Sequence, residues 1–363
     1  MRASTAYPKM TNRSNIKYGS IAAIGLLIAV LFFVDTGNTE SKSSGDVPST
    51  NLRAAGKTAK LSELLAVGMG LTQKAETVIK EVKKDHGEEM QVKGYTKEGV
   101  IEPVTVADNL SNKVFVNGFR NHFGTRMTIL SEETEPEEDP VTVESTELHP
   151  DFQTELNTKG QDPELDLSKV LIVVDPLDAT KEFSEGLLEY VTTMVCVVYE
   201  GKPIAGIINQ VFEAQKPPVV GVLAGEDGAP GVLYNRNKEP PASEEAAHTV
   251  AISKSHTGEG GNVVEKYLDN HTVLLAGGAG YKALLVLDGK AEAYVHVTNI
   301  KSWDVCAADV VTKAAGGEFT DIVGEPLAYS SEKDEAVFTN GLIATGSVKD
   351  HKYFVDSLDG RLK

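Results

Sequence analysis

Two aspartates three residues apart close an apolar run in the stretch VVDPLDATKEF, at residues 173–183. The carboxylates of Asp175 and Asp178 would repel each other if both were ionised and close, unless hydrogen bonds or a cation compensated. Magnesium prefers oxygen ligands, and Pro176 fixes the backbone so that the Leu177 carbonyl can add another oxygen. Asp-Pro and Asp-Ala-Thr sequences also form ordinary turns. From this stretch alone, a metal site and a plain turn are both open.

More acidic residues stand at junctions between apolar segments, in SEET (131–134) and SWDVCAAD (302–309). Glu133 and Asp304 would complete a set of oxygen ligands with the two aspartates. Trp303 is the only tryptophan of the chain, and we expect it to pack in the core at the start of a helix. An aspartate at that position can cap the helix and still bind a metal. These additional acids favour a metal centre over a turn.

The elements that must position these acids are an ordered series of helices and strands. Helical spacing of apolar residues predicts helices at 60–83, from Asp108 through Phe119, near 263–268, around 281–287 and at about 303–315. Asp108 would cap the first turn of its helix. Strands are predicted at 127–134, 170–174, twice within 190–212, at 250–252, 272–275 and 291–297. Residues 135–169 are acidic and should be mostly irregular, so the order predicts a layered α+β or α/β fold.

The N-terminus carries a topological signal. Residues 18–34 are uncharged and about long enough to cross a bilayer, with four basic residues before them and acidic residues after them. This predicts a type II protein with a cytosolic segment 1–17, an anchor 18–34, a lumenal stalk 35–58 and a lumenal domain 59–363. That domain would divide into parts at about 59–212 and 213–363. A cleaved signal peptide is the alternative interpretation.

Composition narrows the class of partner and leaves the compartment open. The chain has 363 residues, 41% of them hydrophobic, and a formal charge of −18, which argues against a nucleic-acid polymer as partner. A small phosphate ester remains suitable if a metal supplies positive charge. Cys196 and Cys306 are too few for a disulfide framework, and their apolar surroundings predict buried thiols. The sequons at Asn109 and Asn270 would face a glycosylating lumen.

Three ordered motifs carry a resemblance to a known family. SEE, DPLDAT and WDVCAADVVTKAAGG, over residues 60–350, resemble the inositol monophosphatase superfamily of lithium-sensitive, magnesium-dependent phosphatases. The resemblance implies an αβαβα sandwich, two or three Mg²⁺ ions and inhibition by Li⁺, and it leaves a homodimer open. Within that superfamily, ISKSH (252–256), GGAGYK (277–282), YVHVTNIKSWD (294–304) and the anchor are most similar to the Golgi branch, which acts on adenosine 3′,5′-bisphosphate.

The resemblance also implies roles for individual residues. The metal ligands would be Glu133, Asp175, the Leu177 carbonyl, Asp178 and Asp304. Asp108 and Thr180 would together orient and deprotonate the attacking water. Nucleotide contacts would come from Ser253, His256, Gly278, Lys282 and Asp304, with glycines that let backbone N–H groups approach an anion.

The function implied by the resemblance is removal of the 3′-phosphate of adenosine 3′,5′-bisphosphate in the Golgi lumen, giving AMP and phosphate. This activity would sustain sulfation and glycosaminoglycan synthesis. An inositol phosphate is the alternative substrate, and an inactive, membrane-anchored binding homologue is the alternative from another class. Many superfamily members have glycine where Ala179 stands, so the turn here must be one that alanine can adopt.

Overall fold

The computed structural model describes residues 57–86, 90–95, 101–143, 147–223, 231–237, 248–254 and 257–358. Contacts group residues 51–363 into one compact unit. The predicted anchor at 18–34 and nearly all of the predicted stalk lie outside the described residues. Within the described ranges, no helix is both long and apolar enough to cross a membrane.

A six-stranded sheet carries the two aspartates. Its strand order is β10-β9-β8-β7-β6-β4, with β4 parallel to β6 and the other neighbours antiparallel. The strands are β4 (Thr128–Ser131), β6 (Val170–Asp178), β7 (Thr192–Tyr199), β8 (Lys202–Gln210), β9 (Val219–Val222) and β10 (Val232–Tyr234). Since β9 and β10 lie beyond residue 212, the first structural layer extends past the boundary suggested by the sequence.

A five-stranded sheet, ordered β12-β11-β13-β17-β15, forms a second layer, in which β11 is parallel to both of its neighbours. Its strands are β11 (His248–Ser253), β12 (His271–Ala276), β13 (Ala293–His296), β15 (Glu318–Thr320) and β17 (Leu342–Thr345). Three two-stranded ladders join β1 (Thr58–Lys60) to β5 (Glu164–Asp166), β2 (Met90–Tyr95) to β3 (Ile101–Thr105), and β14 (Ile300–Lys301) to β16 (Val337–Phe338).

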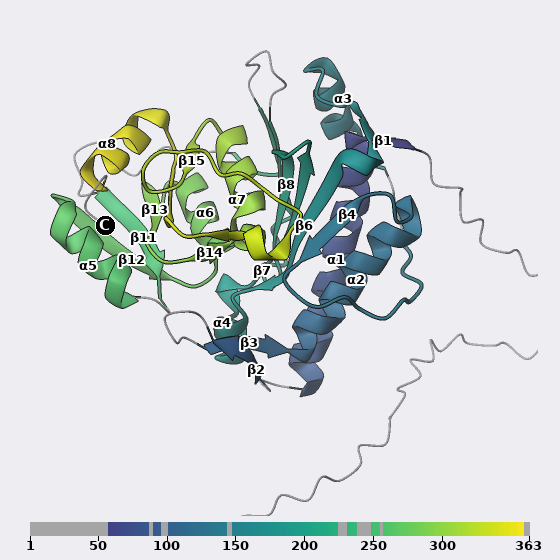
Figure 1. The fold of residues 1–363 in the computed structure, drawn as a ribbon, viewed down its shortest axis with the longest axis horizontal. Helices are drawn as coiled ribbons and strands as arrows, with labels where there is room; N and C mark the ends of the chain where they lie inside the picture. The colour runs from purple at the N-terminus through teal and green to yellow at the C-terminus, as the bar shows by residue number, and fades with distance from the viewer. Residues whose placement is uncertain are drawn as a thin grey trace, which may run out of the picture. The chain divides into compact units, whose positions relative to one another are not determined.

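Helices pack on both faces of each sheet. They are α1 (Leu61–His86), α2 (Val106–Phe123), α3 (Pro150–Thr158), α4 (Thr180–Ser184), α5 (Thr257–Tyr267), α6 (Ala279–Leu287), α7 (Ser302–Ala314) and α8 (Val348–Leu358). Short 3₁₀ turns are η1 (Leu167–Lys169), η2 (Leu188–Tyr190) and η3 (Lys333–Glu335). Figure 1 shows α6 and α7 between the two sheets, with α1 and α2 outside one sheet and α5 and α8 outside the other.

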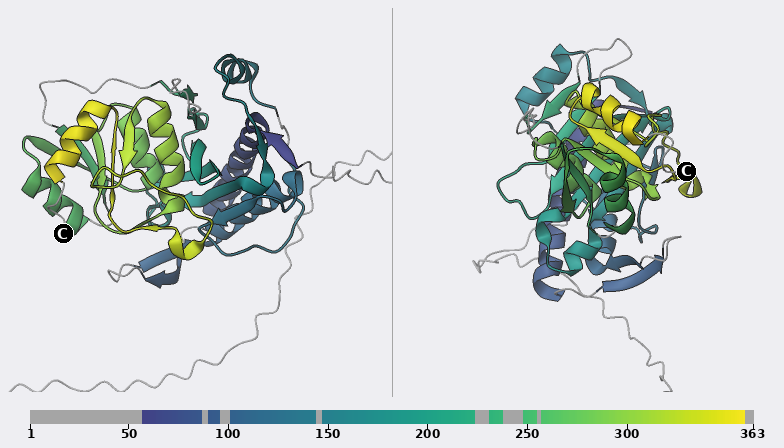
Figure 2. Two further views of the ribbon diagram at one scale, coloured as in Figure 1. Left: turned by 45° about the horizontal axis from the view of Figure 1, so that its top comes forward. Right: turned by 90° about the vertical axis from the view of Figure 1, so that its left-hand side faces the viewer.

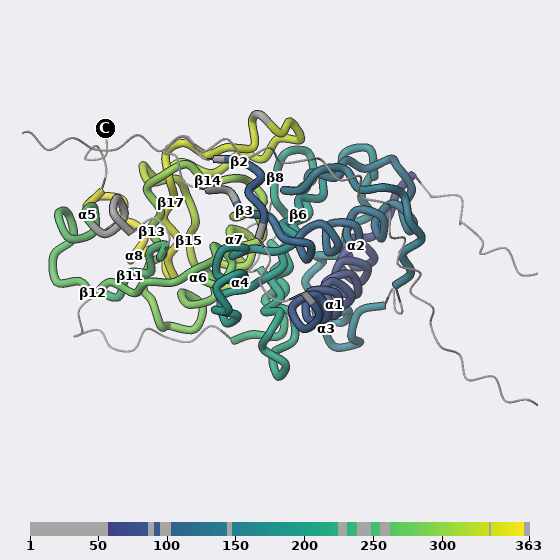
Figure 3. Tube along the Cα trace, turned by 90° about the horizontal axis from the view of Figure 1, so that it is seen from below, coloured from purple at the N-terminus to yellow at the C-terminus, as the bar shows by residue number. Residues whose placement is uncertain are grey.

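Alternation of side chains along the strands creates these layers. On β6, Ile172 and Val174 join the core under α1 and α2, whereas Leu171 and Val173 join the core with α6 and α7. On β11, Val250 contributes to a third core with α5 and α8. The predicted αβαβα sandwich is therefore confirmed, and the further views of Figure 2 and the tube of Figure 3 show the same succession of layers.

Several local predictions need correction. The second helix begins at Val106, with Thr105 as its N-cap, so Asp108 is the third helical residue and not the cap itself. Residues 135–169, predicted to be mostly irregular, contain α3 and β5. The strand predicted at 170–174 continues to Asp178. The elements that follow α7, including β15, β17 and α8, were not predicted from the sequence. Strands of three and four residues give weak periodicity, whereas α8 is an 11-residue amphipathic helix whose buried His351, Phe354 and Leu358 follow helical spacing and could have been recognised.

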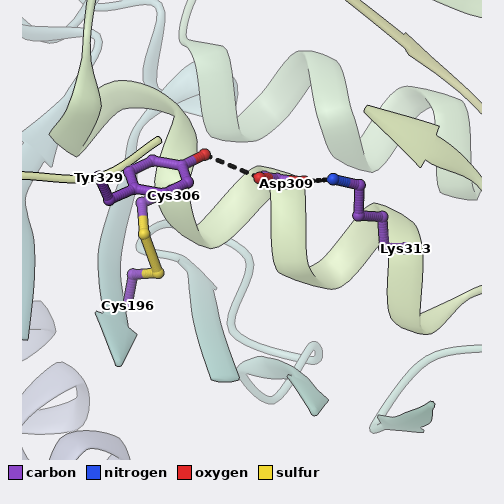
Figure 4. Close-up of a disulfide and its surroundings, with 5 residues drawn as sticks. All are labelled: Cys196, Cys306, Asp309, Lys313 and Tyr329. Carbon is purple, nitrogen blue, oxygen red and sulfur yellow. Dashed lines mark hydrogen bonds and ion pairs between the residues drawn. A yellow bond between two sulfur atoms is a disulfide. The ribbon is translucent and has the colours of Figure 1, made fainter. Parts of the chain in front are cut away.

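The prediction of two buried thiols is wrong. Cys196 on β7 and Cys306 on α7 form a disulfide, with their Cα atoms 5.8 Å apart (Figure 4). The pair arises because α7 lies very close to the sheet: a Cβ added at Gly206 would come within 2.8 Å of the Ala307 carbonyl oxygen. Burial of both residues was predicted correctly, but sequence spacing did not reveal that they face each other across 110 positions.

Candidate active site

A β-bulge puts the two aspartates on the same face of the sheet. Asp175 lies opposite Met194 and Asp178 opposite Thr192, so three steps along β6 match two steps along β7. In a regular strand, residues three apart point to opposite faces, and the one extra residue cancels that alternation. Both aspartates are buried, as is Leu177 between them. The bulge is thus the reason that the two carboxylates lie on the same face of the sheet.

The carboxylate of Asp178 accepts hydrogen bonds from three donors on two elements, β7 and α6. Its donors are the Thr192 hydroxyl at 3.0 Å and the backbone N–H groups of Ala279 and Gly280 at 3.1 and 2.9 Å. The last two open helix α6, whose N-terminus favours negative charge. A Cβ added at Gly278 would lie 2.9 Å from the Asp178 carboxylate. The anion approached by the glycine loop in this structure is therefore the protein's own Asp178.

Asp108 and Thr180, which stand 72 positions apart, are hydrogen-bonded. The Thr180 hydroxyl donates to Asp108 Oδ1 at 2.8 Å, and it also lies 3.1 Å from the Leu177 carbonyl oxygen. The other carboxylate oxygen of Asp108 accepts from the backbone N–H of Thr105 at 2.8 Å and from its hydroxyl. Burial raises the pKa of Asp108 to about 6, although these hydrogen bonds oppose the rise. The residue consequently stabilises the start of α2 and orients Thr180.

Ala179 occupies the left-handed region, with φ 69° and ψ 42°, directly between Asp178 and α4. This conformation lets the chain leave β6 and begin α4 at Thr180. An L-residue with a Cβ pays about 1–2 kcal/mol for that region, which glycine adopts freely. Ala179 therefore adopts the same left-handed conformation that glycine would adopt at this position.

Glu132 is a half-buried member of the site that was not predicted from the sequence. Ser131 pairs with Val174 in the parallel β4–β6 ladder, and the Glu132 N–H continues it by donating to the Val174 carbonyl at 3.1 Å. Glu132 is therefore the neighbour of Asp175. Burial raises its pKa to about 8; the Lys93 ammonium opposes this rise, and the charge of Asp304 adds to it. The Glu-Glu pair was a visible signal, but its register against β6 was not.

Glu133, the glutamate that was predicted as a ligand, is buried and shares an ion-pair partner with Glu132. The Lys93 ammonium, on the β2–β3 hairpin, lies 2.5 Å from a carboxylate oxygen of Glu133 and 2.5 Å from one of Glu132. The charge of Glu133 also contributes to the raised pKa of Asp108. Lys93 thus supplies a positive charge that balances both glutamates.

Asp304 enters the site from the first turn of α7. Asp304 is the third helical residue, and its Oδ2 accepts the backbone N–H of the N-cap Lys301 at 3.0 Å, so, like Asp108, it supports the helix start from the third position and is not the cap itself. Burial raises the pKa of Asp304 to about 7, and the charge of Asp178 adds to the effect. Burial and the nearby acids raise the pKa of Asp175 well above its usual value. The structure therefore concentrates acids that follow β4, end β6 and begin α7 at one place.

The predicted nucleotide contacts are only partly brought together. Ser253 ends β11 opposite Ala276, the residue before the glycine loop. Lys282 is buried behind that loop: its ammonium donates to the Gly278 carbonyl at 2.5 Å and lies 4.9 Å from the Tyr294 ring centre. The predicted contact His256 lies outside the described residues.

The acids fit a hard divalent cation in their chemistry. They offer oxygen only, and Asp175 and Asp178 are buried while Glu132 and Asp304 are half-buried. Their charges raise one another's pKa, so the favourable partner for the set is a positive ion. Across the described ranges, however, no three Asp, Glu, His or Cys side chains are arranged as a ready-made metal-ion site. The donor set fits magnesium, and its carboxylates would have to close on the ion.

Comparisons with known proteins identify the family of this chain. The model of the inositol monophosphatase family matches residues 60–352. Inositol monophosphatase 3 of Danio rerio is 36% identical over 310 residues, covering 83% of this chain and 85% of that protein. The human Golgi-resident adenosine 3′,5′-bisphosphate 3′-phosphatase is 33% identical over 284 residues, covering 76% of each chain.

Solved structures show the same fold at lower identity. The extragenic suppressor protein suhB from Bartonella henselae aligns with a TM-score of 0.58 and 18% identity, covering 82% of this chain and 98% of that one. Inositol monophosphatase from Anabaena (Nostoc) sp. PCC 7120 aligns with a TM-score of 0.54 and 18% identity, covering 82% and 95%. The chain belongs to the inositol monophosphatase family.

Proposed function

We propose that this family member is a magnesium-dependent phosphatase that removes the 3′-phosphate of adenosine 3′,5′-bisphosphate, giving AMP and phosphate. The observation that carries the proposal is the Thr180–Asp108 hydrogen bond beside the bulge that pairs Asp175 with Asp178. At this place Asp108, which can accept a proton, lies close to buried acids that require a cation. Lithium inhibition and a supporting role in sulfation and glycosaminoglycan synthesis belong to the same proposal.

Two or three magnesium ions would be held by the oxygen donors around the bulge. These are Glu132, Glu133, Asp175, the Leu177 carbonyl, Asp178 and Asp304. Magnesium supplies the charge that lowers the pKa of water and stabilises a leaving oxygen. We add Glu132 to the ligands expected from the sequence because it lies beside Asp175 in the β4–β6 register.

The chain's own residues would handle the proton of the attacking water. The Thr180 hydroxyl directs its hydrogen to Asp108 Oδ1, which leaves the oxygen lone pairs of Thr180 free to accept a hydrogen bond from water. With its pKa raised to about 6, Asp108 is a better proton acceptor than an ordinary aspartate and is still largely ionised at neutral pH. Thr180 thus orients the nucleophile and relays the proton: its oxygen takes the proton of the water as its own hydroxyl proton passes to Asp108.

The nucleotide substrate is supported by the Golgi-resident relatives, and an inositol phosphate by the relatives that are named inositol monophosphatase 3. A direct comparison decides between them: phosphate release by the full chain, with magnesium and after chelation, from each substrate at matched concentrations. We expect the nucleotide to give the higher kcat/KM and chelation to stop both reactions. A higher kcat/KM for inositol phosphate would contradict the nucleotide assignment.

We further propose a single-pass type II placement in the Golgi membrane, with residues 18–34 as the anchor and the catalytic domain in the lumen. The Cys196–Cys306 disulfide supports this placement, because disulfides persist in oxidising compartments and are rare in the cytosol. The Golgi-resident relatives support it as well. A homodimer remains part of the proposal and is checked by the mass of the purified protein in solution.

The two sequons of the domain differ in a way that allows the lumenal placement to be tested. Asn270, in the turn between α5 and β12, and Thr272, in β12, are both exposed. In the other sequon Ser111 is buried, and its hydroxyl donates to the Ala107 carbonyl within α2. We therefore expect a glycan on Asn270, seen as a mass shift that a glycosidase removes. Asn270→Gln should abolish the shift and Asn109→Gln should not; an unglycosylated protein from secretory-pathway expression would contradict lumenal placement.

A further inference from the structure

Lys333 connects to the segment that carries the two glutamates from 200 positions away. Strand β4, at the edge of its sheet, ends at Ser131, so the carbonyls of Glu132 and Glu133 lie beyond its ladder with β6. The Lys333 ammonium donates to the Glu132 carbonyl at 2.9 Å and also lies 3.3 Å from the Ser131 carbonyl and 3.5 Å from that of Glu133. One ammonium group, with three hydrogens, thus serves three successive carbonyls at this edge.

The same lysine is tied to the start of α7, where Asp304 stands. Lys333 begins η3, which leads into β16, and β16 pairs with β14 immediately before α7. The Ser302 N–H donates to the Ala336 carbonyl at 2.9 Å, and the Lys333 ammonium lies 5.4 Å from the Trp303 ring centre. The backbone around Lys333 is therefore held against the residues that precede Asp304.

We propose that Lys333 is a positioning residue that fixes the Glu132–Glu133 segment relative to Asp304, so that the acids after β4 and the acid at the start of α7 can share one cation. This inference rests on the proposed magnesium-dependent function. Lys333 acts through backbone carbonyls and does not contact the reacting atoms. Because Lys333 bonds to main-chain oxygens, its positive charge lies near the cation site and leaves the carboxylate oxygens available to bind the metal.

Simple electrostatics gives the opposite expectation. An ammonium close to a cation site repels the incoming ion, so removing it at fixed geometry would tighten magnesium binding. If Lys333 positions the glutamates, removing it leaves the carbonyls of residues 131–133 to water and loosens the strand end, which weakens magnesium binding. The sign of the change therefore separates positioning from charge.

Lys301 provides a matched control. Its ammonium lies 5.8 Å from the same Trp303 ring and carries the same charge, but it belongs to the α7 side of the site. Magnesium titration calorimetry on the full chain should give a Kd at least about tenfold weaker for Lys333→Met, the effect of losing about one charged hydrogen bond. Lys301→Met should bind magnesium as tightly as the wild type or more tightly, and Lys333→Arg should approach the wild type. An unchanged or tighter Kd for Lys333→Met overturns the proposal.

A second measurement works without any metal. The Glu132 amide is bonded to the Val174 carbonyl, so its hydrogen exchange reports directly on the end of β4. In the metal-free full chain, we expect faster exchange at Glu132 in Lys333→Met but not in Lys301→Met. Equal protection in the wild type and Lys333→Met contradicts positioning. If the wild type bound no magnesium, the proposed function would fail, while this exchange result would still decide the role of Lys333.

Discussion

Ala179 shows how a single backbone angle shapes the site. At φ 69° it turns the chain from the bulge into α4, and it bears a Cβ that this region disfavours. Ala179→Gly should relieve that cost, partly offset by the greater flexibility of glycine in the unfolded chain, for a net gain of up to about 1 kcal/mol.

Urea unfolding measures this gain. Ala315→Gly serves as the control, because Ala315 ends α7 at an ordinary φ of −78° and should gain nothing from glycine. Equal or lower stability of Ala179→Gly relative to the wild type would show that the left-handed alanine is not strained.

The buried acids make the metal-free protein sensitive to pH. The pKa values of Asp108, Asp304 and Glu132 are raised to about 6, 7 and 8, whereas unfolded carboxyl groups titrate near about 4. Their neutral forms are favoured in the folded state, so the stability they contribute is complete below about pH 4 and is lost as pH rises through 6 to 8.

The melting temperature of chelated protein should therefore fall between pH 5 and pH 8, and added magnesium should restore more stability at pH 8 than at pH 5. Asp304→Asn should flatten the fall, because it removes one titrating group. Differential scanning fluorimetry measures both effects. A melting temperature of the chelated wild type that rises over this interval would contradict the raised pKa values of these carboxyl groups.

At the scale of elements, periodicity predicted which segments are helices and strands but not how they align. The helices from Leu61, Ala279 and Ser302 and most strands of both sheets were predicted close to their observed positions. The Asp175–Asp178 bulge, the approach of Glu132 to Asp175 and the disulfide depend on strand register and helix–sheet distance. Strand register and helix–sheet distance cannot be predicted from the local pattern of apolar residues in one sequence. The family motifs supplied the Asp108–Thr180 pairing, which no local rule predicts.

The close packing of α7 on the sheet depends on glycines in neighbouring strands. A Cβ added at Gly221 on β9 would lie 2.8 Å from Val311 Cα, a backbone atom that cannot move alone. Gly221→Ala should therefore push α7 away and destabilise the protein by about 1–3 kcal/mol, the usual cost of overpacking.

Gly68→Ala, within helix α1, is the comparison for this prediction. Its new Cβ would lie 2.9 Å from the flexible end of the Ile207 side chain on β8. The better helix propensity of alanine should offset that contact, leaving stability nearly unchanged. Thermal unfolding of both variants tests the difference. A Gly221→Ala protein as stable as the wild type would mean that α7 does not depend on this close approach.

At the scale of the whole molecule, the disulfide connects the sheet that holds the aspartates to the helix that holds Asp304. Around it, buried Asp309 accepts the Tyr329 hydroxyl at 2.8 Å and pairs with Lys313 at 2.9 Å (Figure 4). The bond closes a loop of 110 positions, for which chain-entropy arguments give about 4–5 kcal/mol.

The double variant Cys196→Ala with Cys306→Ala should lower the free energy of unfolding by about 2–5 kcal/mol. Reduction of the wild type under unfolding conditions should lower it by a similar amount and leave the variant unchanged. Urea unfolding with and without reductant provides the measurement. Identical wild-type curves under both conditions would contradict the disulfide and remove its support for an oxidising compartment.

The central claim is that buried acids at the end of β6 bind magnesium for phosphate ester hydrolysis, and Asp178→Asn tests it most directly. Phosphate release from adenosine 3′,5′-bisphosphate should be measured at saturating magnesium for the wild type, Asp178→Asn and Asp356→Asn, an exposed acid on α8 that pairs with Lys352. We predict that Asp178→Asn lowers kcat/KM at least about a hundredfold, in line with losses of a single charge-stabilising group. Asp356→Asn should retain wild-type activity. Wild-type turnover by Asp178→Asn would contradict the account.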